Sequence, residues 1–408
     1  MSALAERPAA LALAPRQSAA ARGYASMAVE SDISAIAGDW RALEETALLT
    51  PYQARAWVAA FVATVGRSHG MDFRHVVLRD GRGQPLAILP LVITRRNGIR
   101  FAEFIGGKHA NYHMGVYAPD FAAGLDAQAA RAMLMEIAAA IGGLDAFVFV
   151  NQPVEWRGIA NPMALLAAGP SPSGSYKLAL TAGDCDGALR RAMSSHAHKK
   201  LKNKRNRFST FGPSQVVRAT SEAEIERVIA AFLAQKAMRF AAMGIADPFA
   251  DPAMRGFLKQ GASGERPALQ LYSLDLAGRS IATYVGAVQG QRFSGMATSF
   301  DMESEVAKTS PGEILLIDLI KLQCQAGITC FDLGVGEARY KTTICDERDE
   351  LVDTFVPVTA KGRLFAGVAR ARRSAKRWIK TQPRLLKLAH RASGLLDKAR
   401  GRSRTAEE

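Results

Sequence analysis

Two stretches of the chain are laid out alike, and this repetition constrains the fold more than any other feature. DFRHVVLRDGRGQPLAILPLVI (72–93) and LQLYSLDLAGRSIATYVGAV (269–288) each hold two strand-like runs joined by a turn that contains glycine. In both halves, helices precede these runs and a third strand-like run follows them. Two copies of one α/β unit of about 150 residues explain this layout better than one long domain. The sequence therefore predicts tandem α/β units, each a mixed twisted sheet flanked by helices.

The spacing of apolar residues places the elements of each unit. The first unit contains helices over 31–66, strands at 75–80 and 85–96, a helix around 125–142 and a strand at 147–150. The second contains a strand at 176–180, a helix from 184 into the basic run, a helix over 221–243, strands at 269–276, 280–289 and 292–300, a helix over 310–325 and a strand at 329–336. Gly, Pro and Ser cluster at 169–175 and mark a linker. The predicted boundaries are a leader over 1–28, domains over 29–170 and 175–360, and a tail over 361–408.

Composition narrows the class of protein. No stretch approaches the roughly 18 uncharged apolar residues that a membrane-spanning helix needs. In the N-terminal run the apolar patch covers only residues 11–14, which is too short for a signal-peptide core, so we expect a disordered leader. The four cysteines show neither metal-ligand nor redox spacing: Cys185, Cys324, Cys330 and Cys345. These features predict a cytoplasmic protein with reduced thiols and no metal.

Positive charge is concentrated in the tail. Residues 361–408 contain 15 Lys and Arg against 3 Asp and Glu, a net charge of +12 out of +15 for the whole chain. Apolar residues recur there at near-heptad spacing: Leu364, Val368, Ala371, Ala375 and Trp378. This pattern is typical of a cationic amphipathic helix that lies on an anionic membrane. Packing of the helix against the protein's own body explains it equally well.

Three segments carry a family resemblance: RALEETALLTPYQARAWVAAF (41–61), HKKLKNKRNRFSTFG (198–212) and SPGEILLIDLIKLQCQAGITCFDLGVGEARYK (310–341). They resemble, in that order, the N-terminal helices, the basic helix of the second domain and the most distinctive stretch of CelD-like acetyltransferases. That family is associated with bacterial exopolysaccharide and cellulose synthesis and is related to the FemAB-like transferases. The resemblance implies tandem GNAT-like domains, with acetyl-CoA or another acyl-CoA as the donor held by the second domain.

The start of the long apolar helix in the second unit is the predicted donor site. Ser310 as N-cap, Pro311 at the first position and Glu313 at the third fit a capping box. Gly312 allows a ligand to approach the backbone. Free N–H groups and the positive end of the helix dipole suit a pyrophosphate, which is how GNAT enzymes hold coenzyme A, and Lys308 adds a counter-charge. A capped buried helix without a ligand is the alternative.

The segment FDLGVGEARYK supplies the predicted catalytic residues, because its polar side chains follow the end of an apolar strand. Acyl transfer to an amine needs a base, and an acid that protonates the leaving thiolate. We expect Glu337 or Asp332 as the base and Tyr340 as the acid. Lys341 would hold a substrate carboxylate or phosphate as a point charge. A tight turn whose charges pair with one another is the alternative.

A polar and aromatic loop in the first unit is the predicted acceptor-binding segment. Asn111, Tyr112 and His113 lie between Gly107 and Gly115, and loops mounted on a rigid sheet often carry function. The acceptor would lie between the domains and would be an amine or hydroxyl of a small molecule or of a polysaccharide precursor. An ordinary surface loop is the alternative.

Two further classes of function remain open. Six Lys and Arg lie within residues 199–207, either as a solvated helix face or as contacts to phosphate groups. An aminoacyl-tRNA-dependent transferase, as among the FemAB relatives, would use this run and the tail to bind tRNA. A non-catalytic accessory protein of a membrane-bound polysaccharide synthase would use the tail alone.

Overall fold

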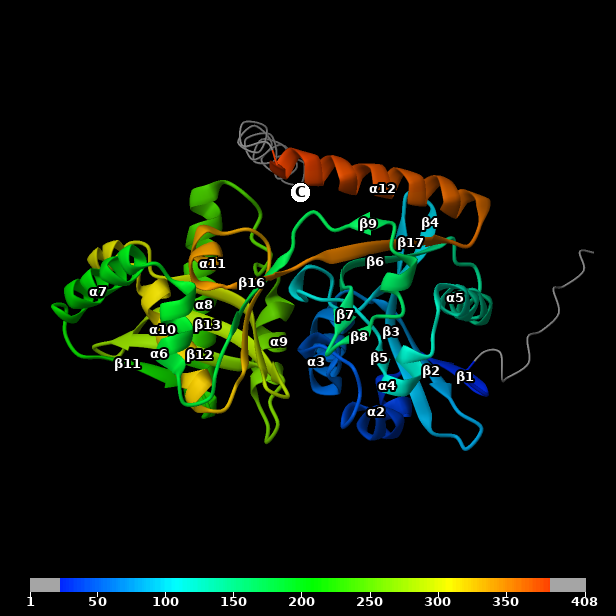
Figure 1. Cartoon of the computed structure of the whole chain (residues 1–408), viewed down its shortest axis with the longest axis horizontal. Helices are drawn as coiled ribbons and strands as arrows, with labels where there is room; N and C mark the ends of the chain where they lie inside the picture. The colour runs from blue at the N-terminus through cyan, green and yellow to red at the C-terminus, as the bar shows by residue number, and fades with distance from the viewer. Residues whose placement is uncertain (1–22, 382–408) are drawn as a thin grey trace, which may run out of the picture.

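The computed structural model describes residues 23–381, which form two α/β units lying side by side (Figure 1). The strands of the first sheet are β1 (Ser26–Glu30), β2 (Asp72–Arg79), β3 (Pro85–Arg96), β4 (Ile99–Phe104), β5 (Val116–Tyr117), β6 (Ala146–Pro153), β9 (Gly169–Pro170) and β17 (Leu351–Pro357). A hairpin of β7 (Glu155–Trp156) and β8 (Ile159–Ala160) follows β6. The helices of this unit are α2 (Ala37–Glu44), α3 (Arg55–Phe61), α4 (Pro119–Ala123), α5 (Ala127–Ile141) and α12 (Ala360–Thr381).

The second unit is built from the middle of the chain. Its strands are β10 (Ser175–Ala179), β11 (Ser214–Arg218), β12 (Gln270–Leu276), β13 (Arg279–Gln289), β14 (Arg292–Phe300), β15 (Cys330–Val335) and β16 (Glu347–Asp349). Its helices are α6 (Cys185–Ala192), α7 (Ser195–Ser209), α8 (Glu222–Met243), α9 (Pro252–Ala262), α10 (Pro311–Gln325) and α11 (Arg339–Ile344). The predicted helices and strands of both units are confirmed, except that the helix after residue 184 is two helices.

The two sheets repeat one spatial arrangement of strands and strand directions, which confirms the tandem α/β fold. The first runs β1-β2-β3-β4-β6-β17-β9 and the second β11-β12-β13-β14-β15-β10-β16. In each, a parallel pair, β4–β6 or β14–β15, is flanked on both sides by antiparallel strands. The similar layout of residues 72–93 and 269–288 therefore reflects β2–β3 and β12–β13, which occupy equivalent places in the two sheets.

Strand β17 corrects the predicted domain boundary. The sequence assigns residues up to 360 to the second domain, but β17 pairs antiparallel with β6 in the first sheet, with Phe355 opposite Val148. Figure 1 shows this orange strand running from the second unit into the first. The predicted linker over 169–175 likewise contains β9, which pairs with β17. Strand partners distant in the chain leave no trace in local periodicity, so the sequence could not place β17.

Helix α12 lies across the first sheet, over β6 and β17 (Figure 1). Phe365 stacks on Phe101 with ring centroids 5.1 Å apart, and Ala366 is buried in the same cluster. Arg373 forms an ion pair with the buried carboxylate of Asp353. The first half of the predicted tail is therefore part of the fold, because Phe365, Ala366 and Arg373 of α12 all contact the first sheet.

A disulfide corrects the prediction of reduced thiols. Cys185 of α6 is bonded to Cys324 of α10, across 139 residues of sequence. Cys330 and Cys345 are free thiols. Cysteine spacing predicts local metal and redox motifs but not pairs that only the tertiary fold brings together.

The ends of the chain are described in part. Of the predicted leader, residues 1–22 lie outside the described residues, and Ser26 already pairs with Arg79 in the first sheet. Of the tail, residues 382–408 lie outside them. Across residues 23–381, none of the helices combines the length and the apolar character needed to span a bilayer.

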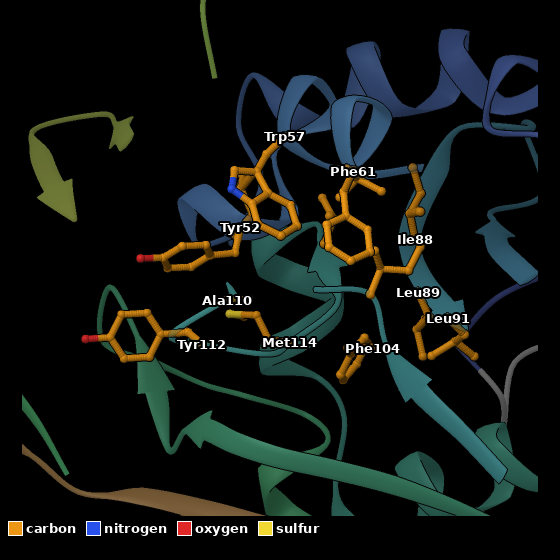
Figure 2. Close-up of a cluster of buried hydrophobic side chains, with 14 of the residues drawn as sticks. Tyr52, Trp57, Phe61, Ile88, Leu89, Leu91, Phe104, Ala110, Tyr112 and Met114 are labelled. Atoms are coloured by element: carbon orange, nitrogen blue, oxygen red, sulfur yellow. The ribbon is translucent and has the colours of Figure 1, made fainter. Parts of the chain in front are cut away.

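The core of the first unit meets the second unit through aromatic side chains. Trp57 contacts Phe257 of α9, with ring centroids 5.2 Å apart, so one buried cluster continues across the interface. Figure 2 shows Tyr52 and Tyr112 at the edge of this cluster, with both hydroxyl groups pointing away from it. These hydroxyls reach the polar site on the second sheet.

Candidate active site

The site is centred where the parallel strands β14 and β15 part. They pair over Arg292–Ser294 and Cys330–Asp332. Just beyond, the register of β14 against β13 shifts between Gly295 and Ala297, which marks a β-bulge. Bulges bend a strand away from its neighbour and occur often beside active sites. The backbone of β14 and β15 beyond the bulge is therefore open to other partners.

Asn111 of the first unit occupies this gap. Its side-chain amide donates to the carbonyl of Gly295 (2.8 Å) and to the hydroxyl of Tyr52 (2.6 Å), and its oxygen accepts from the N–H of Val335 (3.4 Å). Gly334 has a φ of 73°, and a Cβ there would lie 2.3 Å from the amide nitrogen of Asn111. The glycine of FDLG is thus required by the close approach of this loop. The loop faces the second unit across the interface.

Asp332 lies beside Asn111 and is fully buried. It accepts hydrogen bonds from the Tyr112 hydroxyl (2.8 Å), the Ser294 hydroxyl (2.9 Å) and the Gly334 N–H (2.7 Å). It also pairs with Arg292 at 3.1 Å. A buried carboxylate that is already bonded to four groups is not available to a substrate proton. We therefore revise the predicted role of Asp332 from base to positioning residue, which fixes Tyr112 and Arg292.

Arg292 joins the two units electrostatically. Its guanidinium lies 4.4 Å from the ring centroid of Trp156 and 5.6 Å from that of Tyr112, within the range of cation–π attraction. Burial disfavours its charge, but the Asp332 carboxylate outweighs this and raises the pKa of Arg292. Burial, followed by the Asp332 charge, raises the pKa of Tyr112. Sequence reasoning missed Arg292 and Trp156, because neither lies in a motif.

A cavity of about 970 Å³ opens between the units at Arg292. Tyr112 and Trp156 line it from the first unit, and Arg292 and Lys177 line it from the second. Six carboxylates also line it: Glu44, Glu45, Glu155, Glu347, Asp349 and Glu350. Lys177 is ion-paired with Glu347 and Asp349, and Arg292 with Asp332. Arg157 and Arg348 line it as well, so six carboxylates face four cations, and this excess of two negative charges favours cationic ligands.

Lys341 is buried and holds the end of β15. Its ammonium donates to the carbonyls of Gly334 and Val335, each at 3.0 Å. Burial lowers its pKa to about 8. These bonds correct the prediction that Lys341 acts as a point charge for a substrate, because two of its three donors serve the strand end.

The remaining predicted catalytic residues lie beyond the same strand end. Tyr340 of α11 is half-buried against the core of the second unit, and burial raises its pKa. Glu337 is exposed; it accepts a hydrogen bond from the Ser173 hydroxyl (3.2 Å) and lies 3.6 Å from the guanidinium of Arg348. Arg348 in turn lines the cavity between the units. A protonated phenol and an accessible carboxylate thus flank the site.

The helix start at Ser310 differs from the predicted capping box. Ser310 has left-handed backbone angles (φ 59°, ψ 60°), and it is its carbonyl that accepts the N–H groups of Glu313 (2.9 Å) and Ile314 (3.2 Å). The Glu313 carboxylate pairs instead with Lys204 of α7. A left-handed serine is a strained conformation of the kind that clusters at functional sites. The sequence could not show this, because serine is a normal N-cap residue.

The other two predicted donor-site residues lie beside this start. Lys308 is exposed near the end of the helical turn η6 (Glu305–Thr309). A Cβ placed on Gly312 would meet Phe300 at 3.5 Å, an ordinary contact. Gly312 therefore tolerates a side chain sterically, and a larger residue there would test ligand binding without disrupting the fold.

His113 points away from the site. It is buried against the first sheet, where Nδ1 lies 3.0 Å from the carbonyl of Val150. Burial lowers its pKa to about 4. The structure thus corrects the prediction that His113 binds the substrate, because its ring fills the interior of the first unit. His75 of β2 is buried as well, and burial lowers its pKa to about 4 too.

Because of these two histidines, we expect the free energy of unfolding to fall markedly in mild acid. Their folded pKa values lie below the unfolded value of about 6.5, so the unfolded chain takes up protons first as the pH falls. Stability is complete above about pH 6.5 and declines towards pH 4, by about 2 kcal/mol per histidine between pH 7 and pH 5. Urea denaturation at both pH values measures this. His75→Met should remove the part of this pH dependence that comes from His75. The control His196→Gln, on the exposed face of α7, should leave the pH dependence as it is. An unchanged pH dependence in His75→Met would contradict the role given to His75.

Comparison with known proteins agrees with this architecture. Residues 195–342, which include β14, α10 and β15, match the family model of an acetyltransferase (GNAT) domain. The crystal structure of FemX is similar with a TM-score of 0.57 and 9% identity, over 84% of this chain and 99% of that one. A conserved protein of unknown function from Bacteroides thetaiotaomicron is similar with a TM-score of 0.50 and 11% identity, over 82% and 100% of the two chains. No curated protein matches by sequence. Most of the second unit therefore matches a GNAT acetyltransferase domain, within a chain whose fold is similar to that of FemX.

Proposed function

We propose that the chain is an acyltransferase that moves an acyl group, foremost acetyl, from acyl-CoA to an amine or hydroxyl of a small molecule or polysaccharide precursor. The observation that carries the proposal is that the GNAT match, residues 195–342, contains the parted strands, the α10 start and Tyr340. The CelD-like resemblance supports a saccharide acceptor and a cytoplasmic site of action.

The donor's pyrophosphate would bind at the start of α10. The helix dipole and the first-turn N–H groups attract anions there. Helix α7, with its basic run, packs beside this start and beside η6. Lys204 neutralises Glu313, and Arg205 is bonded to Asp318 of α10 at 2.6 Å. The acidic residue that would otherwise repel a pyrophosphate is therefore compensated, and the exposed Lys308 adds positive charge.

The proposed chemistry uses the residues after β15. The donor supplies the acyl group as a thioester; the acceptor nitrogen or oxygen bonds to the acyl carbon as the carbon–sulfur bond breaks. Glu337, directly or through water, takes the acceptor's proton, and Tyr340 gives its proton to the sulfur. The raised pKa of Tyr340 keeps that proton in place at neutral pH. Asp332 and Lys341 act indirectly, since they fix the ends of the strands around the site.

The cavity between the units is the proposed acceptor site. It is lined by both units, and its excess of carboxylates favours a protonated amine over an anionic acceptor. The planar faces of Trp156 and Tyr112 offer apolar contact area next to these charges. An amino sugar or a small amine fits this combination best.

We expect Gly312→Asp to weaken coenzyme A binding at least tenfold, because it places a carboxylate where the pyrophosphate would bind. Asp at this position suits the helix dipole, so the variant should remain folded. Calorimetry with acetyl-CoA and longer acyl-CoAs measures the affinity, and circular dichroism checks the fold. Gly312→Ala is the matched control, which adds a Cβ without charge and should bind normally. Unchanged affinity in Gly312→Asp would show that the donor binds elsewhere.

Aminoacyl-tRNA as the donor is the second candidate, favoured by the exposed cations of α7. Lys199, Lys200, Lys202 and Arg207 lie on the surface of this helix. Binding of tRNA through them would weaken steeply with salt. Measured tRNA affinity at two salt concentrations, together with absence of coenzyme A binding, would favour this candidate over the first.

A further inference from the structure

Helix α12 has two faces, and the structure shows which one packs. At 3.6 residues per turn, Phe365, Ala369 and Arg373 fall on one side, and this side contacts the first sheet. The near-heptad stripe falls on the opposite side: Leu364, Val368, Ala371, Ala375 and Trp378. All five stripe residues are exposed, Leu364 by 74% and Trp378 by 60%. Packing of α12 therefore does not use the apolar stripe that the sequence singles out.

The charges of α12 flank this stripe. The helix contains eight Lys and Arg and no Asp or Glu. By helical geometry, Lys361 and Arg372 lie along one side of the stripe, and Arg363 and Arg370 along the other. All four are exposed. An apolar strip between two rows of cations is complementary to a surface that is anionic outside and apolar just beneath.

A cavity beside the helix adds a second anion-attracting feature. It measures about 340 Å³ and lies between α12 and β9, lined by Arg370, Arg373, Arg377 and Trp378 among others. Asp353 also lines it but is ion-paired with Arg373. The charges of Arg370 and Arg377 thus dominate the cavity, which has room for the phosphate of a lipid headgroup.

We propose that α12 is a membrane-docking helix, which lies flat on an anionic bilayer with its stripe among the headgroups. Leu364 and Val368 enter the interface, and Trp378 lies at the depth that tryptophan prefers. The arginines on the flanks contact lipid phosphates, and Arg370 and Arg377 hold one in the cavity. Because α12 is packed on the first sheet, docking presents the whole body to the membrane in one orientation. This inference is independent of the proposed acyl transfer.

Vesicle co-sedimentation of the full-length chain tests the proposal. We expect binding to vesicles of phosphatidylglycerol and phosphatidylcholine, and at least tenfold weaker binding to pure phosphatidylcholine. Leu364→Ser with Val368→Ser should weaken binding about tenfold without changing the melting temperature, since both side chains are exposed. Leu322→Ser, on the exposed side of α10, is the apolar control and should bind normally.

Two double variants that each remove two positive charges distinguish docking through α12 from general electrostatic attraction to the membrane. Arg370→Gln with Arg377→Gln should weaken binding about 25-fold, at roughly fivefold for each charge near an anionic surface. Lys199→Gln with Lys202→Gln removes the same charge from α7 and should change binding less than twofold. Equal losses in the two pairs, or no binding by the unaltered chain, would overturn the proposal. So would a dimer that Leu364→Ser with Val368→Ser converts to a monomer, because the stripe would then be an interface between two copies.

Discussion

Replacing Arg292 by methionine will lower the free energy of unfolding by about 3–5 kcal/mol, the usual effect of removing one partner of a buried ion pair. Arg292 is 17% exposed and its partner Asp332 is fully buried. Without the guanidinium, Asp332 keeps only neutral donors. Methionine fills similar space, so the loss reports mainly the unpaired charge rather than a void.

A double-mutant cycle isolates this pair. Asp332→Asn added to Arg292→Met removes the stranded charge and should recover at least 1–2 kcal/mol, because the amide oxygen can still accept from Tyr112. Arg279→Met is the control, since Arg279 is 76% exposed and pairs with Asp301 at 3.4 Å. A surface pair of this kind contributes about 0–1 kcal/mol. Equal effects of Arg292→Met and Arg279→Met in urea denaturation would show that Arg292 does not anchor the interface.

The same pair explains why the sequence predicts the site only in part. Asp332 and Tyr112 are both among the predicted functional residues, and the structure brings them to 2.8 Å from one another although 220 residues separate them. A polar residue at the end of an apolar strand has the pattern of a catalytic group. The sequence pattern does not show that the first unit buries Asp332. Burial makes Asp332 a positioning residue rather than a base.

The fold is more predictable than the site, because its signals are local. Strands β2, β3, β12 and β13 alternate or run apolar over their own length, and turns with glycine separate them. The pairing of β17 with β6 and the disulfide between Cys185 and Cys324 depend on tertiary contacts. The left-handed Ser310 depends on how η6 meets α10. None of these three features can be predicted from periodicity or residue spacing.

Helix α12 illustrates the same limit of prediction from sequence. The apolar stripe of α12 is visible in the sequence, but the stripe alone does not show which face packs. Phe365 and Arg373 lie off the stripe, and they are the residues that hold α12 to the first sheet. The amphipathic pattern therefore identified a real surface, whereas the packing of the helix came from residues outside the pattern.

Replacing Tyr340 by phenylalanine should lower turnover about a hundredfold, the scale of a lost general acid. The thiolate would then leave without a proton, while the donor, bound through α10, would keep its affinity. Phenylalanine preserves the half-buried ring against the second core, so the variant should keep its melting temperature. Glu337→Gln should lower turnover to a similar degree, because it removes the proposed base.

Turnover is measured as the release of coenzyme A, which is detected by its free thiol. The assay uses the best amine acceptor found or, without an acceptor, the slow hydrolysis of acetyl-CoA. Tyr24→Phe is the matched control: its hydroxyl bonds to Glu136, far along the chain from the proposed site, and its loss should leave turnover unchanged. A general acid acts on the chemical step, so its loss should lower turnover and leave the affinity for the donor unchanged. Comparing turnover with donor affinity therefore separates a catalytic role from a structural one. Tyr340→Phe with normal turnover would make Tyr340 a packing residue. A hundredfold fall with unchanged donor affinity would place the acid at Tyr340, and would locate the thioester beside the end of β15.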